Sequence, residues 1–138
     1  MLNQLIYVSN RACDTLQIEK ILQTAQSYNR SHNITGVLLY TDTKFVQLLE
    51  GDKKDLDTLY DKILKDTRHT SPYVISTDLI LERAFPSWQM AGKRIGTSNI
   101  DYISSISSNE KEKFEETLAG NKENGFFVTE LMKRFFYV

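Results

Sequence analysis

Residues 29–51, NRSHNITGVLLYTDTKFVQLLEG, decide the fold of this chain. They contain two apolar runs, 34–40 and 45–49, which a short polar connection at 41–44 separates. Runs of this length that are rich in β-branched and aromatic residues, and that flank a turn, are typical of a β-hairpin. We therefore predict a hairpin that ends at Gly51.

Gln47 is the unusual residue of this hairpin. Because side chains alternate along a strand, Gln47 shares a face with Phe45 and Leu49, the face that a strand normally buries. A buried amide that lacks hydrogen-bond partners costs about 1–3 kcal/mol. Two interpretations are therefore open: the amide bonds to neighbouring backbone, or it points at a polar, planar ligand.

The composition is that of one globular domain. The chain has 138 residues, of which 41% are hydrophobic and 25% charged, and its net charge is −1. This length suffices for a sizeable core, and the balanced charge provides no basic field for nucleic acid. The single cysteine, Cys13, cannot form an internal disulfide, and no cluster of Cys and His has metal-ligand spacing.

The N-terminal sequence, MLNQLIYVSN, has neither the basic region nor the long apolar region of a signal peptide. No apolar run of the sequence approaches the ~20 residues that a membrane-spanning helix needs. We therefore expect a cytoplasmic protein without a membrane partner.

Hydrophobic spacing predicts the elements on either side of the hairpin. Alternation predicts a first strand at 2–9, and helical spacing predicts a helix that begins after an N-cap at Asp14 or Thr15 and ends near Asn29. The apolar face of this helix consists of Ile18, Ile21, Leu22, Ala25 and Tyr28. After the hairpin, Asp52 is expected to cap a second helix. The apolar face of the second helix consists of Leu56, Leu59, Tyr60, Ile63 and Leu64.

Two further strands are predicted after the second helix, at 73–82 and 87–95. The first places Tyr73, Ile75, Thr77, Leu79 and Leu81 on one face, and the second points Trp88 and Met90 the same way. The order is therefore β-α-β-β-α-β-β. Since βαβ crossovers are right-handed, two of them around a hairpin give an α+β, ferredoxin-like sheet with both helices on one face.

The C-terminal third predicts a helical pair for the other face of the sheet, or for part of a subunit interface. Ser107 and Glu110 form a capping box for a helix that is ended by Gly120 and has Phe114 and Leu118 as its apolar anchors. A second helix at 126–137 has an apolar stripe. That stripe consists of Phe127 or Val128, Leu131, Met132 and Phe135.

Several separated motifs carry a resemblance to a known family. They are Tyr7-Val8-Ser9, Asn29 ahead of Ile34-Thr35-Gly36, Phe45-x-Gln47-x-Leu49-Glu50-Gly51, Asp66-x-Arg68-His69 and Phe85-x-x-Trp88-x-Met90. In these motifs the sequence resembles the BLUF family, blue-light sensors that use a flavin, and specifically its short stand-alone members. The resemblance covers about residues 2–95. It implies a flavin-binding domain at 1–96 and a helical extension at 97–138.

The resemblance also implies roles for single residues. The flavin ring is expected between the two helices, with Ile21 and Ile63 against its faces and Asn29 at its C4=O and N3–H edge. Gln47 is expected to bridge the phenol of Tyr7 and the N5/C4=O edge, and Tyr28 to lie near C2=O. The ribityl and phosphate part is assigned to Lys62, Asp66, Arg68 and His69. Trp88 and Met90 match the strand that relays the signal, and Ala25 stands where several relatives have a serine.

The cofactor implied by the resemblance is FAD, although an apolar ring site is common to FAD, FMN and riboflavin. In the implied cycle Tyr7 reduces the excited flavin, Gln47 rotates or tautomerises, and reverse transfer leaves a stronger hydrogen bond at C4=O. An amide suits this step because it carries both a donor and an acceptor. Population shift without substrate turnover then changes the state of the protein.

The favoured hypothesis is a photoreceptor, not an enzyme, that signals by a changed protein–protein contact, because the chain has no room for an effector enzyme domain. The alternatives are a flavin-dependent redox enzyme and a light-independent ferredoxin-like binding module. The downstream partner is unknown from the sequence. The apolar C-terminal stripe favours a homo-oligomer.

Overall fold

The computed structural model describes residues 1–95, 108–119 and 125–137. The elements follow the predicted order, with two C-terminal helices after the β-α-β-β-α-β-β unit. They are β1 (Leu2–Arg11), α1 (Thr15–Ser31), β2 (Thr35–Tyr40), β3 (Lys44–Asp52), α2 (Lys53–Leu64), β4 (His69–Leu79), β5 (Ala91–Arg94), α3 (Ser108–Leu118) and α4 (Gly125–Phe136). Among the described residues, no helix is both long and apolar enough to cross a membrane.

The sheet has the strand order β4-β1-β3-β2-β5. β1 is antiparallel to β3 and to β4, β2 is antiparallel to β3, and β5 runs parallel to β2. The hairpin β2–β3 and the central pair β1–β3 are as predicted. In the register of that central pair, Tyr7 stands directly opposite Gln47.

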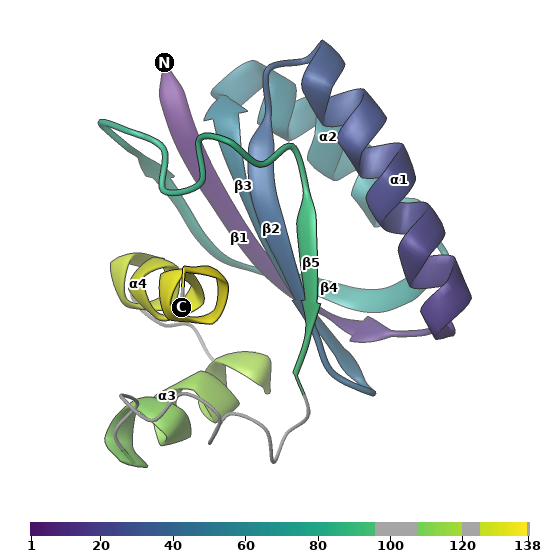
Figure 1. Ribbon diagram of the computed structural model, residues 1–138, viewed down its shortest axis with the longest axis vertical. Helices are drawn as coiled ribbons and strands as arrows, with labels where there is room; N and C mark the ends of the chain where they lie inside the picture. Colours follow the sequence, from purple (N-terminus) through teal and green to yellow (C-terminus); the bar gives the residue numbers. More distant parts are fainter. Residues whose placement is uncertain (96–107, 120–124, 138) are drawn as a thin grey trace.

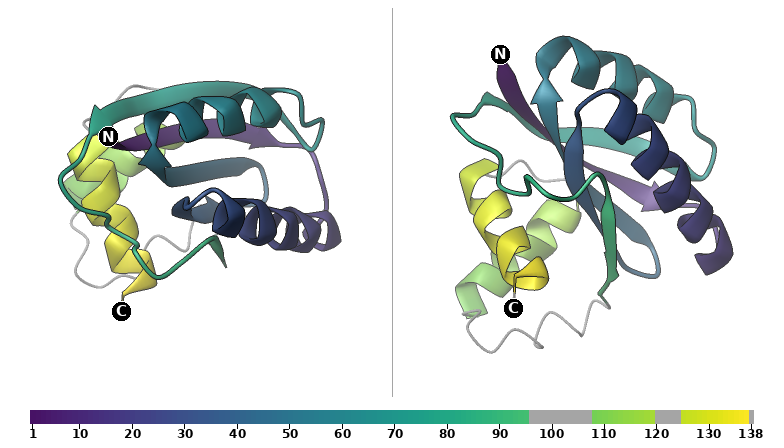
Figure 2. Two further views of the ribbon diagram at one scale, coloured as in Figure 1. Left: turned by 90° about the horizontal axis from the view of Figure 1, so that it is seen from above. Right: turned by 45° about the horizontal axis from the view of Figure 1, so that its top comes forward.

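Helices cover both faces of the sheet, with α1 and α2 on one side and α3 and α4 on the other (Figures 1 and 2). Alternation along the strands divides the core accordingly. Ile6 and Leu48 belong to the cluster that packs against α3 and α4, whereas Leu5 and Leu49 belong to the cluster under α1 and α2. The α+β, ferredoxin-like architecture predicted from the sequence is therefore the observed one.

The helices α1 and α2 begin with different N-terminal contacts. α1 has the expected N-cap at Asp14, whose side chain accepts from the Gln17 backbone N–H in a capping box. Asp52 occupies the N-cap position of α2, but its side chain makes no capping bond, so that expectation was wrong. Its carboxylate lies 3.3 Å from the N-terminal ammonium group instead. α1 extends to Ser31, which places Asn29 in its last turn.

Both strands after α2 differ from their predicted bounds. β4 begins at His69 rather than Tyr73 and ends at Leu79. Pro72 lies within this strand, where a missing N–H is tolerated because β4 is an edge strand. Leu79 and Leu81 are exposed, so they do not continue the predicted apolar face. β5 contains only four residues, Ala91–Arg94, instead of 87–95.

The prediction that Trp88 and Met90 point the same way was wrong. The chain just before β5 forms no ladder with the sheet, so strand alternation does not govern its side chains. Trp88 packs against the cluster next to α4, whereas Met90 lies in the cluster beneath α1 and α2. This segment therefore passes from one face of the sheet to the other.

The C-terminal helices bury the predicted apolar residues. Phe114 and Leu118 of α3 are buried. The buried apolar residues of α4 are Val128, Leu131, Met132 and Phe135, and Phe127 is partly buried. The predicted capping residue Ser107 and the predicted terminating residue Gly120 lie outside the described residues.

The substitution Leu131→Ala tests the packing of α4 on the sheet. Leu131 is 1% exposed, and truncating a buried leucine typically costs about 2–5 kcal/mol of unfolding free energy. The control, Leu16→Ala on α1, removes a leucine that is 62% exposed and should change the stability by less than about 0.5 kcal/mol. Urea denaturation measures both variants. Equal effects of the two substitutions would contradict the observed packing.

Candidate functional site

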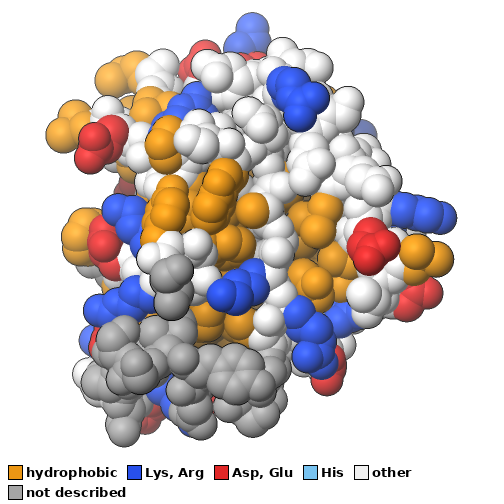
Figure 3. All heavy atoms as spheres, viewed as in Figure 1, with side chains coloured by type: hydrophobic (Ala, Val, Ile, Leu, Met, Phe, Trp, Pro, Cys, Tyr) orange, Lys and Arg blue, Asp and Glu red, His pale blue; other side chains and the backbone are white. Residues whose placement is uncertain are grey.

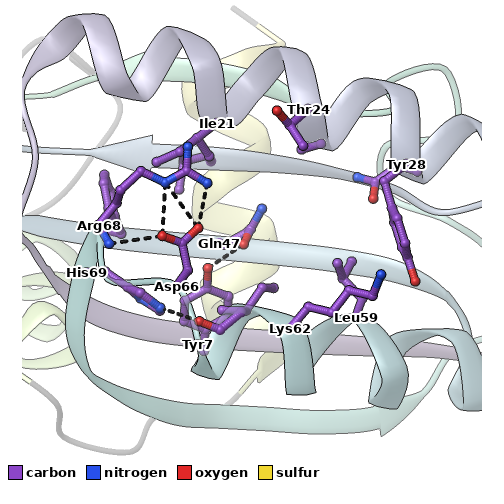
Figure 4. A pocket seen from close by; sticks show the side chains of 15 residues that line it. Tyr7, Ile21, Thr24, Tyr28, Gln47, Leu59, Lys62, Asp66, Arg68 and His69 are labelled. Atoms are coloured by element: carbon purple, nitrogen blue, oxygen red, sulfur yellow. Dashed lines mark hydrogen bonds and ion pairs between the residues drawn. The ribbon is translucent and has the colours of Figure 1, made fainter.

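A cavity of about 290 Å³ lies between α1, α2 and the face of the sheet beneath them. It is mostly apolar, with polar groups on its floor and at its ends (Figure 4). The lining residues are Tyr7, Ile21, Thr24, Ala25, Tyr28, Asn29, Leu38, Phe45, Gln47, Leu59, Lys62, Ile63, Asp66, Arg68 and His69.

All ten residues expected from the sequence to contact a cofactor line this one cavity. They come from β1, α1, β3, α2, the connection after α2, and the first residue of β4. Neither of the two expected relay residues lines the cavity. Met90 contacts the side chain of Gln47 through its sulfur, whereas Trp88 packs in the cluster on the other face of the sheet.

The floor of the cavity carries a buried hydrogen bond between neighbouring strands. The Tyr7 hydroxyl donates to Gln47 Oε1 over 2.5 Å, and Gln47 Nε2 donates to Met90 Sδ over 3.5 Å. Both Tyr7 and Gln47 are only 5% exposed. Burial raises the pKa of Tyr7 well above its ordinary value of 10.0, since the phenolate would lose its hydration. The phenol is therefore a neutral donor at physiological pH.

His69 fixes one side of this floor. Its ring lies 6.0 Å from that of Tyr7, in an edge-on arrangement. His69 Nε2 lies 2.6 Å from the Ile63 carbonyl oxygen, and Nδ1 lies 2.8 Å from Ser9 Oγ. A carbonyl can only accept, so Nε2 carries a proton and donates to Ile63, while Nδ1 is engaged with the Ser9 hydroxyl. Because both ring nitrogens have protein partners, His69 offers the cavity its ring rather than a donor.

Asn29 brings a polar group to the cavity wall. Its Nδ2 donates to the Gln89 carbonyl oxygen over 2.6 Å. Its Oδ1 is buried, and no described residue donates to it. Buried side-chain acceptors nearly always have a partner. The wall therefore presents an acceptor that a ligand with an N–H or O–H group would satisfy.

Charged groups stand at two ends of the cavity (Figure 4). At one end, Arg68 donates through Nε and Nη2 to the Asp66 carboxylate, at distances of 2.6–3.2 Å. These bonds hold the pKa of Asp66 below its usual value. At the other end, the Lys62 ammonium lies 4.7 Å from the centre of the Tyr28 ring, a cation–π distance.

The cavity also has lining residues that the sequence did not single out as ligand contacts, among them Thr24, Leu38 and Leu59. Thr24 lies three residues after Ile21, and Leu59 lies three residues before Lys62, on the same helical faces. Helical spacing would have identified both. Leu38 stands opposite Gln47 in the β2–β3 register, which follows only once the hairpin register is known.

This arrangement suits a planar, largely apolar ring with a polar edge. The apolar walls can enclose such a ring, Asn29 Oδ1 can accept from its edge, and the buried pair of Tyr7 and Gln47 can exchange a proton. Within the described parts of the chain, no three His, Cys, Asp or Glu side chains are placed to hold a metal ion.

Known proteins match both the sequence and the fold. The sequence model of the family described as sensors of blue light using FAD, BLUF, matches residues 2–91. A photoactivated adenylate cyclase subunit beta of Euglena longa is 41% identical over 88 residues. That match covers 62% of this chain but 10% of the cyclase subunit, so this chain spans only a small part of that relative.

Two structures match over nearly their whole length. The photo-activated state of BlsA is 27% identical with a TM-score of 0.76, and the match covers 100% of this chain and 96% of BlsA. The dark-state structure of BlrB, a BLUF protein, is 25% identical with a TM-score of 0.70, and 96% of each chain is covered. The family model covers well over half of the sequence, including both strands that carry Tyr7 and Gln47. The chain therefore belongs to the BLUF family.

Proposed function

We propose that the protein is a blue-light photoreceptor that binds a flavin in the cavity beneath α1 and α2. The observation that carries this proposal is the buried Tyr7–Gln47 hydrogen bond on the floor of a mostly apolar cavity. Membership of the BLUF family supports it. Light then rearranges this hydrogen-bond network and changes contacts with other proteins, with no substrate turned over.

In this proposal the flavin ring lies between Ile21 of α1 and Ile63 of α2. Asn29 Oδ1, which no described residue satisfies, accepts from the ring N3–H. Tyr28 contacts the C2=O side. The fit is supported by chemistry, because N3–H is the single N–H of an oxidised flavin ring and Asn29 offers a single unused buried acceptor.

One end of the cavity is assigned to the ribityl and phosphate part of the cofactor. Arg68 supplies positive charge there, and Asp66 holds the Arg68 guanidinium in one orientation. Lys62, which the sequence also assigned to this part, lies beside Tyr28 at the other end, where its ammonium faces the ring end of the cofactor. His69 contributes its ring to the ribityl and phosphate part, since its nitrogens are engaged with Ile63 and Ser9. We propose FAD as the natural cofactor, in agreement with the family description.

The photochemical step falls to Tyr7 and Gln47. A bound flavin supplies a chromophore that becomes a strong oxidant when it absorbs blue light. Tyr7 gives up an electron from its buried phenol, and its proton passes along the 2.5 Å hydrogen bond to Gln47 Oε1. With a flavin bound, the electron would go to the flavin, and the protonated amide would either rotate or pass a proton from Nε2 to the flavin; both changes interchange its donor and acceptor positions. The electron and the proton would then return from the flavin to Tyr7, and the rearranged amide would be the stored signal.

Met90 and Trp88 relay this change. Met90 Sδ accepts from Gln47 Nε2, so a rearranged amide removes the partner of that sulfur. On the other face of the sheet, the Trp88 ring lies 5.4 Å from Phe136 and 5.1 Å from Tyr137, at the end of α4. A shift of this segment thus alters the surface at the end of α4, and we propose that this surface contacts a partner protein or a second copy of the chain.

The direct test is the absorption spectrum of the purified protein in darkness and immediately after blue illumination. A flavin spectrum that moves slightly to the red and recovers in darkness is expected. Bleaching of the flavin would instead support a redox enzyme, and a protein that takes up no flavin would support a light-independent binding module. Chromatography of the released chromophore identifies it as FAD, FMN or riboflavin.

Gln47→Leu should bind flavin and lose the light-induced red shift, because leucine fills the space but can neither accept nor donate. Difference absorption spectra measure the effect. The matched control is Gln4→Leu, which replaces another buried glutamine of the sheet on the face toward α4. The control should keep the shift. A normal shift in Gln47→Leu would contradict the proposed switch.

Asn29→Ala should weaken flavin binding by about 1–3 kcal/mol, because the buried N–H of the bound ring would be left without an acceptor. Quenching of flavin fluorescence during titration measures the affinity. Asn29 also tethers the chain at Gln89, so the control is Gln26→Ala, which removes the neighbouring tether at the Met90 carbonyl without touching the cavity. Equal losses in both variants would show that the tether, and not the cavity acceptor, matters for binding.

A further inference from the structure

Glu50 is a buried carboxylate outside the cavity. It lies three residues after Gln47 on β3, so its side chain points to the opposite face of the sheet, toward α4. It is 1% exposed. Burial raises the pKa of this carboxyl, while bonds from two backbone N–H groups and the charges of Arg83 and Lys133 act in the other direction. Burying a charged carboxylate costs folding free energy unless its oxygens accept hydrogen bonds.

Both carboxylate oxygens of Glu50 accept hydrogen bonds from the first residues of the segment that leads to β5. The backbone N–H of Ala84 donates to one oxygen over 2.6 Å, and that of Phe85 donates to the other over 2.9 Å. Arg83 completes the attachment. Its guanidinium donates to the Glu50 carbonyl oxygen, to Thr35 Oγ1 and to the Asn33 carbonyl oxygen, at 2.7–2.8 Å.

The far end of the same segment is tied to other elements. The N–H of Gly36 on β2 donates to the Trp88 carbonyl over 2.9 Å, and Asn29 and Gln26 of α1 donate to the Gln89 and Met90 carbonyls. Between these ends no sheet ladder sets the register of the chain. Its path across the sheet therefore depends on where each end is held.

Aromatic packing fills the space between this segment and α4. Phe85, Trp88 and Tyr137 pack with ring centres 5.1–5.7 Å apart, and the Tyr137 hydroxyl donates to the Ala84 carbonyl over 3.0 Å. Figure 3 shows hydrophobic side chains gathered in this region of the surface. The peptide of Ala84 thus links Glu50 on β3 to the end of α4.

We infer that Glu50 is the positioning residue for residues 84–90: with Arg83, it holds Trp88 against the end of α4 and Met90 against Gln47. The inference goes beyond the proposed function and needs neither flavin nor light. A carboxylate accepts both N–H groups at once, whereas a carboxamide of the same size offers one acceptor oxygen and turns an NH₂ group toward the second N–H. Glu50→Gln therefore releases one end of the segment without opening a cavity.

Trp88 is the single tryptophan of the chain, so its fluorescence reports on this segment alone. In the dark, Glu50→Gln should shift the Trp88 emission to the red and increase its quenching by acrylamide, because the ring leaves the aromatic packing. Arg83→Gln, at the partly exposed outer half of the attachment, should act in the same direction. This second variant keeps the test valid if Glu50→Gln does not fold.

The control is Thr117→Val, which keeps the side-chain shape but removes a buried hydroxyl of α3 that bonds to the Lys113 carbonyl of the same helix. It should leave the Trp88 emission unchanged.

Acid should also move the wild-type emission toward that of Glu50→Gln, since protonation of the Glu50 carboxylate removes a hydrogen-bond acceptor. This acid-induced change in emission should be absent in Glu50→Gln. Circular dichroism of the same samples excludes unfolding. Wild-type emission in Glu50→Gln and Arg83→Gln, or an equal shift in Thr117→Val, would overturn the inference.

Discussion

The register between β1 and β3 is the constraint on which the rest of the structure depends. It runs from Leu2 opposite Asp52 to Asn10 opposite Lys44, and it brings the Tyr7 hydroxyl within 2.5 Å of Gln47 Oε1. A slip of one residue would turn the side chains of one strand to the opposite face of the sheet. Apolar side chains on both faces resist such a slip, because each face is covered by helices and either face would lose its core. The burial of apolar side chains on both faces of the sheet thus fixes the relative positions of Tyr7 and Gln47.

The same sheet also separates two chemically different faces. Under α1 and α2 lies the cavity with Tyr7 and Gln47, whereas the other face packs against α3 and α4. The segment before β5 passes between these faces, with Met90 on one and Trp88 on the other. It is held by side-chain contacts and by a backbone bond from Gly36 to Trp88 rather than by a ladder, so it can move without breaking the pairing of strands.

The sequence predicted the structural features that follow from the spacing of hydrophobic residues. The hairpin, the neighbouring positions of Tyr7 and Gln47, and the helical faces toward the cavity all follow from alternation and from the spacing of residues such as Ile21 and Ile63. Patterns did not predict the opposite directions of Trp88 and Met90, since that segment is positioned by Glu50 and Arg83, contacts between distant parts of the sequence. For the same reason the sequence did not reveal that His69 uses both ring nitrogens within the protein, or that Asp52 bonds to the N-terminus.

If light rearranges the hydrogen bonds around Gln47, the flavin itself should be chemically unchanged in the illuminated state. An infrared difference spectrum of the flavin-loaded protein, illuminated minus dark, measures both properties. We expect a shift of the flavin C4=O stretch to lower frequency, since a stronger hydrogen bond weakens that double bond, together with changes in an amide band that isotope labelling of glutamine displaces. Both signals should reverse in darkness. A spectrum of stably reduced flavin, or a C4=O band that does not move, would show that light does not act through the hydrogen bonds of Gln47.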